Sequence, residues 1–155
     1  MTTVQIFDAQ GDSQTVSSED LIFRPAVYGI YIELDQIFLL RNLKTQLLRP
    51  PGRIVAENEE PAQAIRHYFR ELAEITPVLG SMLFMETQYR QENDQSWKLS
   101  ALYYAIERPS LDSINFLEDK ELQLQPEWLP LDRLNRTQFQ FGYEAIQAGK
   151  LHLQL

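Results

Sequence analysis

Four polar side chains in the middle of the chain recur at a spacing that could serve a divalent metal ion. In a helix, with about 100° between successive residues, Glu60, His67, Glu71 and Glu74 would project from one face. Hard cations such as Mg²⁺ prefer oxygen ligands, and the backbone carbonyl of a tight turn at Gly52 could supply one more. The spacing therefore predicts a metal site, although the solvated face of an ordinary amphipathic helix has the same pattern.

The helix that would position these side chains has a recognisable start and a recognisable buried face. Pro61 suits the first helical position, because the amide proton that proline lacks would have no partner there. Ile65, Tyr68, Phe69 and Leu72 follow at the spacing i, i+3, i+4, i+7, which places them on one buried face. We expect one helix that packs into a core and presents its acidic side chains on the far side.

The strongest strand signal lies before this helix. Residues 26–34 and 37–40 are rich in β-branched and aromatic side chains, and they flank a turn at Leu34, Asp35 and Gln36. Their near-continuous apolar character predicts a strand buried on both faces, with layers on either side. Further strands are expected in several stretches, which are 1–20 (as a short pair), 46–49, 81–90, 96–108 and 122–124.

The C-terminal part predicts a closing helix. Asn135 or Thr137 would cap it, Tyr143 and Ile146 would lie on its apolar face together with Phe139, and a glycine at position 149 would end it. The order of elements predicts an α/β (α+β) fold with a mixed sheet sandwiched between helices, in α/β/α layers. In this prediction the chain divides into an N-terminal arm (1–20), one domain (21–149) and a tail (150–155).

Composition excludes several function classes. The chain of 155 residues has a formal net charge of -8 and a pI of about 4.7, so an extended nucleic-acid interface is not expected. The absence of cysteine excludes thiolate metal sites, and two histidines are too few for a histidine-rich zinc site. The sequence has neither an apolar run of the roughly 18 residues that a membrane span needs nor a signal-peptide pattern, so we expect a cytoplasmic protein.

Three side chains outside the helix could contact an anionic or aromatic ligand. Arg24 and Arg41 lie at the ends of predicted strands, and arginine matches the geometry of a phosphate group. Tyr89 lies on a long predicted hairpin and could stack on a nucleobase. Surface arginines and an aromatic side chain that packs on a sheet are the alternatives that the sequence leaves open.

Three local patterns, in their order along the chain, resemble the Nudix hydrolases (MutT-like proteins) over about residues 21–149. The box of this family reads G-x5-E-x7-R-E-U-x-E-E-x-G-U, where U is apolar. Gly52 opens the corresponding stretch here, and the residues RELAE at 70–74 resemble its second half. The residues RPAVYG at 24–29 resemble the start of the family's first core strand, and WLPLDRL at 128–134 resembles the entry to its closing helix.

The box fits the predicted helix in two registers, and it is degenerate in both. In the first register Arg70, Glu71 and Glu74 match the pattern R-E-U-x-E, but the last glutamate and the glycine are replaced. The second register keeps the spacing nearly without gaps and makes Glu59 the first glutamate, while Glu71 is the only helix glutamate that remains. Glu71 therefore occupies a metal-ligand position in either register.

The resemblance implies a divalent-metal-dependent pyrophosphohydrolase that acts on nucleoside-diphosphate-linked substrates, and hence a small nucleotide-type ligand. The implied cofactor is Mg²⁺ or Mn²⁺, which would be held by Gly52, Glu59, Glu71 and Glu74. Glu71 and Glu74 would be catalytic, and Arg70 would orient an acid. The two arginines and the tyrosine described above would contact the substrate.

The replaced box residues favour a different function for the same fold. This alternative is a catalytically inactive Nudix-fold module that keeps the pocket and binds a nucleotide-like ligand or a protein partner. The retained glutamates of the helix favour the enzyme. The long hairpin over 81–108 also offers an edge at which a homodimer could form.

Overall fold

The computed structural model describes residues 2–7, 12–74, 76–107 and 123–154, and neither helix within them is long and apolar enough to cross a membrane. These helices are α1 (Pro61–Ala73) and α2 (Tyr143–Gln154). The strands are β1 (Thr3–Phe7), β2 (Ser13–Ser17), β3 (Ile22–Ile30), β4 (Ile32–Glu33), β5 (Gln36–Asn42), β6 (Leu48–Arg49), β7 (Gly52–Ile54), β8 (Val78–Glu92), β9 (Gln95–Glu107) and β10 (Leu124–Pro130). Short 3₁₀ turns are η1 (Ser18–Asp20), η2 (Leu131–Arg133) and η3 (Arg136–Gln138).

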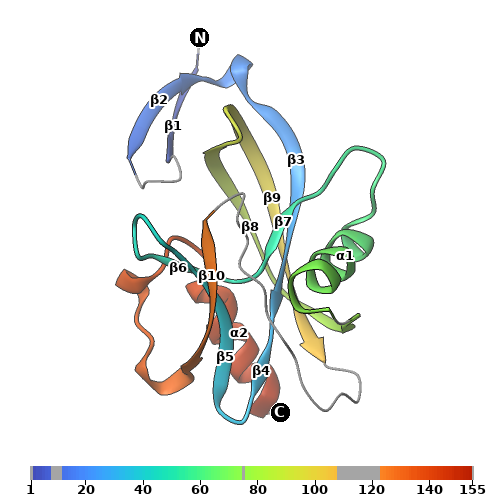
Figure 1. Cartoon of the computed structure of the whole chain (residues 1–155). Coiled ribbons are helices and arrows are strands. Elements are labelled where there is room, and N and C mark those ends of the chain that lie inside the picture. The colour runs from blue at the N-terminus through green and yellow to red at the C-terminus, as the bar shows by residue number, and fades with distance from the viewer. Residues whose placement is uncertain (1, 8–11, 75, 108–122, 155) are drawn as a thin grey trace.

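The strands form two sheets (Figure 1). The larger sheet has the order β2-β1-β8-β9-β3-β7, and β3 and β9 pair in parallel at its centre. The smaller sheet has the order β10-β5-β4, with β6 paired to β5. The mixed α+β architecture is as predicted, but the strands divide between two sheets. The division arises where the chain leaves β3 at Ile30 and enters β4 at Ile32.

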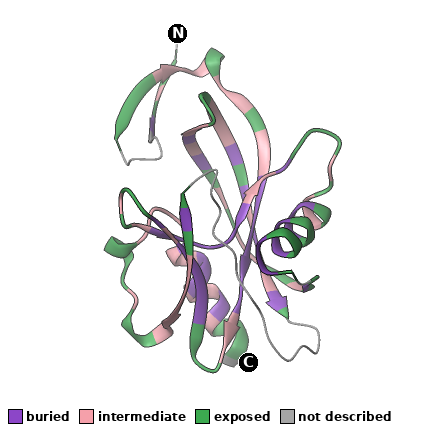
Figure 2. Cartoon of the chain, viewed as in Figure 1, coloured by how far each residue is buried: buried purple, intermediate pink, exposed green. Residues whose placement is uncertain are grey.

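The second half of β3, Ala26–Ile30, is buried on both faces, as its apolar sequence predicts, whereas the first half is partly exposed (Figure 2). Alternate residues point to opposite sides of a strand. Val27 accordingly packs in the core cluster that contains the buried face of α1. Ala26, Tyr28 and Ile30 pack in a second cluster, which contains Ala145 and Ile146 of α2. Each helix thus covers one side of β3.

Helix α1 begins where the sequence predicts and buries the predicted face. Glu60 is its N-cap and Pro61 its first residue. Gly29 of β3 allows the close packing, because a Cβ there would lie 2.8 Å from the Phe69 ring. The buried side chains of the helix are Ala64, Ile65, Tyr68, Phe69, Leu72 and Ala73.

The end of α1 differs from the prediction. Ala73 is the last helical residue, and Glu74 is the C-cap in the left-handed conformation, with φ 58° and ψ 27°. The helical projection that placed Glu74 beside Glu71 therefore does not hold at this residue. The sequence offers no glycine to signal the end, and glycine is the usual residue in this conformation.

The long hairpin is confirmed, since β8 and β9 pair in antiparallel fashion along most of their length. Its turn is tighter than the predicted polar loop, because Asn93 and Asp94 alone make it with φ values of 55° and 60°. Arg108 of the predicted second strand lies outside the described residues. So does residue 122, where the next strand was predicted to begin; the described part of that strand, β10, starts at Leu124.

The prediction for the closing helix is wrong at both ends. Asn135 caps η3 instead, where its Oδ1 accepts a hydrogen bond from the Thr137 amide at 3.1 Å, and α2 starts only at Tyr143. The helix then passes through Gly149 and continues to Gln154. A Cβ at Gly149 would lie 2.9 Å from Cγ2 of Ile30, so this glycine serves close packing on β3 and does not end the helix.

Candidate functional site

Gly52 fixes the loop that precedes α1 against the larger sheet. It pairs with Tyr28 where β7 runs along β3. A Cβ at Gly52 would lie 2.0 Å from the Val27 carbonyl oxygen and 2.6 Å from the Tyr28 Cα, so only glycine fits at this position. The role of its own carbonyl as a metal ligand stays a prediction.

Glu59, a predicted metal ligand, forms a bidentate ion pair with Arg53. Nη1 and Nη2 of Arg53 donate to the two carboxylate oxygens, each at 2.8 Å, and the Ala56 amide donates to Oε1 at 3.1 Å. The hydrogen bonds from Arg53 hold the pKa of Glu59 below its ordinary value, although partial burial opposes this shift. Both oxygens are therefore engaged in fixing the shape of the loop.

The exposed face of α1 carries the other predicted site residues. The Glu71 side chain is 75% exposed, and its Oε1 lies 3.8 Å from Nε2 of His67. Arg70 donates to the Thr76 hydroxyl at 3.1 Å and 3.2 Å, and Glu74 follows as the C-cap. Nowhere in the described ranges do three His, Cys, Asp or Glu side chains come close enough together to hold a metal ion. These residues therefore offer no preformed carboxylate cluster for Mg²⁺ or Mn²⁺.

The two arginines that were predicted to bind substrate have partners within the protein. Arg41 donates from Nε to the Glu127 carboxylate and from Nη1 to the Gln46 carbonyl, the latter at 2.9 Å. Arg24 makes a looser surface pair, with 3.7 Å between its Nη2 and Oε2 of Glu57. Contact of either residue with a substrate stays a prediction.

Tyr89, the third predicted substrate contact, lines a cavity of about 420 Å³. The cavity lies between β1, the second half of β8, the residue before β6, and the segment that leads into α2. Its lining residues are Gln5, Leu47, Glu86, Gln88, Tyr89, Arg90, Phe139, Gln140 and Phe141.

A buried charge cluster adjoins this cavity. Arg90 and Arg49 are only 5% and 3% exposed. Glu92 lies between them, with its Oε1 3.4 Å from Nη1 of Arg49 and its Oε2 3.7 Å from Nη2 of Arg90. Burial alone would raise the pKa of Glu92, but the two guanidinium groups hold it below its ordinary value. Two cations and one carboxylate leave the cluster with one positive charge in excess.

Arg90 has no hydrogen-bond partner on the described part of the protein. Its Nε, Nη1 and Nη2 atoms all lack such a partner, and Nε of Arg49 lacks one as well. The Arg90 guanidinium instead lies over the Phe141 ring, 4.7 Å from the ring centroid. The Tyr28 hydroxyl and the Glu92 carboxylate lie close to this guanidinium and oppose the cost of its burial, but its N–H donors remain open to a further acceptor.

Two buried acceptors line the same cavity from β8. Oε2 of Glu86 and Oε1 of Gln88 have no hydrogen-bond partner among the described residues. The other amide atom of Gln88, Nε2, donates to the Tyr103 hydroxyl at 2.9 Å. Burial raises the pKa of Glu86, and hydrogen bonding by Tyr103 and Gln88 offsets only part of that rise. The cavity thus combines a guanidinium that lacks hydrogen bonds with acceptor atoms that lack donors, among the described residues.

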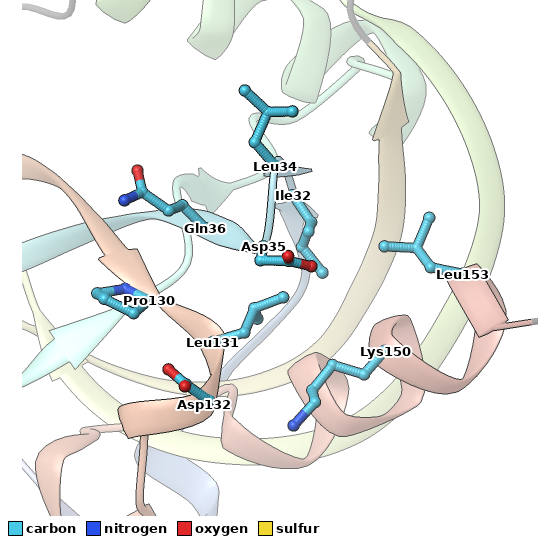
Figure 3. A pocket seen from close by; sticks show the side chains of 9 residues that line it. All are labelled: Ile32, Leu34, Asp35, Gln36, Pro130, Leu131, Asp132, Lys150 and Leu153. Carbon is cyan, nitrogen blue, oxygen red and sulfur yellow. The ribbon is translucent and has the colours of Figure 1, made fainter.

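A larger cavity of about 610 Å³ lies elsewhere, between the turn from β4 to β5, the turn η2, and α2 (Figure 3). Asp35, Asp132 and Lys150 line it together with several apolar side chains. It is an open surface feature, since Leu34 at its rim is 96% exposed. No lining residue has a buried polar atom that lacks a partner among the described residues. We therefore place the candidate site at the cavity beside β8.

Sequence reasoning missed Arg49, Arg90, Gln88 and Phe141. One signal was available, because Glu86, Gln88 and Arg90 alternate in a predicted strand, and this period of two places them on one face. Their burial and their proximity to Phe141 depend on contacts between residues that are distant along the sequence, and no local pattern indicates these contacts.

Comparison with solved structures places the fold of this chain among Nudix folds. A MutT protein from Methanosarcina mazei Go1 matches with a TM-score of 0.62 at 14% identity, over 87% of this chain and 96% of its own. A MutT NUDIX hydrolase from Burkholderia pseudomallei matches with a TM-score of 0.64 at 17% identity, over 82% of this chain and 98% of its own.

A C. elegans Ap4A hydrolase is also similar, with a TM-score of 0.60 at 15% identity, over 85% of this chain and 99% of its own. No protein-family model matches the sequence, and no curated protein matches it either. The predicted Nudix fold is thereby confirmed, and identities this low concern the fold alone.

Proposed function

We propose that this Nudix-fold protein binds a small nucleotide-like anion in the cavity beside β8, with the anionic group at Arg90. One observation carries the proposal. The Arg90 guanidinium is buried beside a cavity of about 420 Å³ and has no hydrogen-bond partner among the described residues. An anion would supply the missing acceptors and would offset the excess positive charge of the cluster.

The rest of the lining suits the same class of ligand. Phe139 and Phe141 provide aromatic surface on which a flat nucleobase can stack. Arginine presents a planar fork of donors that matches a phosphate or carboxylate group. The volume lies within the usual range of about 300–1,000 Å³ for small-molecule sites.

Metal-dependent hydrolysis of a nucleoside-diphosphate-linked substrate is the second candidate, and the fold favours it. Proteins with similar structures include one described as a UDP-X diphosphatase and one described as an Ap4A hydrolase. Glu71 is exposed and free to meet an ion in solution, whereas Glu59 is engaged by Arg53. Without a carboxylate cluster in the described chain, the residues fit Mg²⁺ or Mn²⁺ poorly, so binding is the function we favour.

The conformation of Glu74 supports the register of the Nudix box in which the metal ligands are lost. Glycine is preferred at a left-handed helix end, and in the second register Glu74 takes the position of the box glycine. Tyr68 and Leu72 then occupy glutamate positions, and both are buried in the core. Glu71 is the single helix carboxylate left in this register, which favours ligand binding without hydrolysis.

Self-association through the β8–β9 hairpin is proposed as a further property. Met82 and Met85 on β8 are 52% and 61% exposed, which is unusual for apolar side chains of this size. Sedimentation of the protein over a range of concentrations tests this proposal. A purely monomeric species, or a dimer that Met85→Glu does not weaken, would count against it.

Calorimetric titration separates binding from hydrolysis. ADP and ADP-ribose are titrated into the protein with and without MgCl₂, and chromatography of the same mixtures detects cleaved products. We expect binding that does not require metal, leaves the nucleotide intact, and weakens by roughly tenfold or more in Arg90→Met. Arg133→Met makes the same change at an exposed arginine of η2 and should bind as the wild type does.

Two results would contradict the proposed binding function. Failure of both nucleotides to bind would exclude it. Metal-dependent release of product that is abolished in Glu71→Gln would establish the hydrolase in its place.

A further inference from the structure

Three side chains of β8 lie in a row along the candidate cavity. Glu86, Gln88 and Arg90 alternate along the strand, so they share one face, and all three line the cavity. A strand rises about 3.3 Å per residue, which puts the backbones of Glu86 and Arg90 about 13 Å apart. The row therefore has two chemically different ends, a carboxylate and a guanidinium.

Acceptor atoms at the carboxylate end lack donors, just as the N–H groups at the guanidinium end lack acceptors. Oε2 of Glu86 and Oε1 of Gln88 are buried without a partner in the part of the chain that the structure describes. Gln88 uses its amide nitrogen for the Tyr103 hydroxyl, which leaves the carbonyl oxygen for another donor. Glu86 and Arg90 do not satisfy each other, because atoms of both remain unpaired.

We infer that the ligand of this cavity is bipolar, with an anionic group that meets Arg90 and N–H donors that meet Glu86 and Gln88. The inference rests on the proposed ligand-binding function and specifies its ligand class. In a mononucleotide the phosphate supplies the anion, and an amino-substituted nucleobase supplies the N–H donors. A base that lacks the amino group would leave a buried acceptor unpaired, and sites built around such acceptors reject analogues of this kind strongly.

Two pairs of mononucleotides test the inference in the intact protein. GMP and IMP differ by one amino group on a purine, and CMP carries an amino group where UMP carries a carbonyl oxygen. Calorimetry should show that the amino-bearing member of at least one pair binds the wild type about tenfold more tightly than its partner. In Glu86→Gln this ratio should fall, because the neutral amide offers one acceptor oxygen in place of two. Glu107→Gln, the same change at an exposed residue near the end of β9, should keep it.

The outcomes separate this inference from the proposed function. If all four nucleotides bind equally, and Arg90→Met still abolishes binding, the bipolar ligand is excluded while anion binding stands. An amino preference that persists unchanged in Glu86→Gln also excludes it, provided that the Tm of the variant shows a folded protein. If no nucleotide binds through Arg90, the proposed function fails and this inference fails with it.

Discussion

The guanidinium of Arg90 lies 4.7 Å from the ring centroid of Phe141, and this contact joins β8 to the segment that leads into α2. The same ring also lies 5.5 Å from the guanidinium carbon of Arg49. A desolvated cation over an aromatic face gains roughly 2 kcal/mol. Phe141 therefore contacts both cations, and it offers Arg90 a favourable contact where hydrogen bonds are lacking.

Replacement of Phe141 by leucine should show how much the two buried arginines depend on its ring. We expect Phe141→Leu to lower the free energy of unfolding by about 1–3 kcal/mol in urea titrations, from lost packing and lost cation–π contact. A double-mutant cycle with Arg90→Met should give a coupling of about 1–2 kcal/mol. Phe139→Leu is the matched control, because Phe139 packs on Tyr143, and its coupling to Arg90 should be much smaller. Equal coupling for both phenylalanines would disprove the contact's role.

Glu92 should stabilise the folded state by compensating the charge of the two buried arginines. Glu92→Gln leaves two guanidinium groups without their shared carboxylate, so we expect a loss of about 3–5 kcal/mol at neutral pH. Because the folded-state pKa of Glu92 is lowered, its contribution is present above the unfolded-state pKa of about 4.3 and is lost as the pH falls through the folded-state value. Urea titrations should show the gap between wild type and variant narrowing below about pH 4. A gap that does not change with pH would refute this role of Glu92.

Glu86 should have the opposite effect on stability. Burial raises its folded-state pKa, so its ionisation disfavours the folded state at neutral pH, and this cost disappears as the pH falls through the raised value toward the unfolded-state one. We expect Glu86→Gln to raise the Tm at neutral pH, by an amount that shrinks on acidification. Glu107→Gln, at an exposed position, should leave the Tm nearly unchanged at each pH. A lower Tm for Glu86→Gln at neutral pH would show that the charged carboxylate is satisfied in the free protein.

Glu74 should be replaceable by glycine with a gain in stability. Its left-handed conformation is costly for a residue with a Cβ and free for glycine, so Glu74→Gly should stabilise the protein by about 1 kcal/mol. Glu71→Gly, inside the helix, should instead destabilise it by about 1 kcal/mol. Chemical denaturation measures both changes. If Glu74→Gly binds Mn²⁺ less tightly than the wild type, Glu74 is a metal ligand after all.

The parts of the fold that follow from one buried face were predictable from the sequence. The spacing of Ile65, Phe69 and Leu72 indicated α1, and the apolar run of β3 indicated burial on both of its faces. The ends of the helices were harder to predict, because Glu74 adopts a conformation typical of glycine, and Gly149 serves packing inside α2.

The candidate site was the least predictable part. Tyr89 was expected to contact a ligand and is among the residues that line the cavity. The other lining residues come from β1, β8, the residue before β6 and the segment before α2. Arg90 reads in the sequence as the polar end of a hairpin strand. Its burial follows from long-range packing against Tyr28 and Phe141, which no local periodicity encodes.

Side-chain NMR of arginine Nε–H groups tests the central claim most directly. The Arg90 signal is identified by its absence from Arg90→Met, and ADP is titrated with and without Mg²⁺. Binding at Arg90 predicts that this signal shifts and saturates together with the calorimetric isotherm, whether or not metal is present. If the Arg90 signal stays fixed while resonances of the α1 face around Glu71 shift only with metal, the ligand binds at the helix, and binding at Arg90 is contradicted.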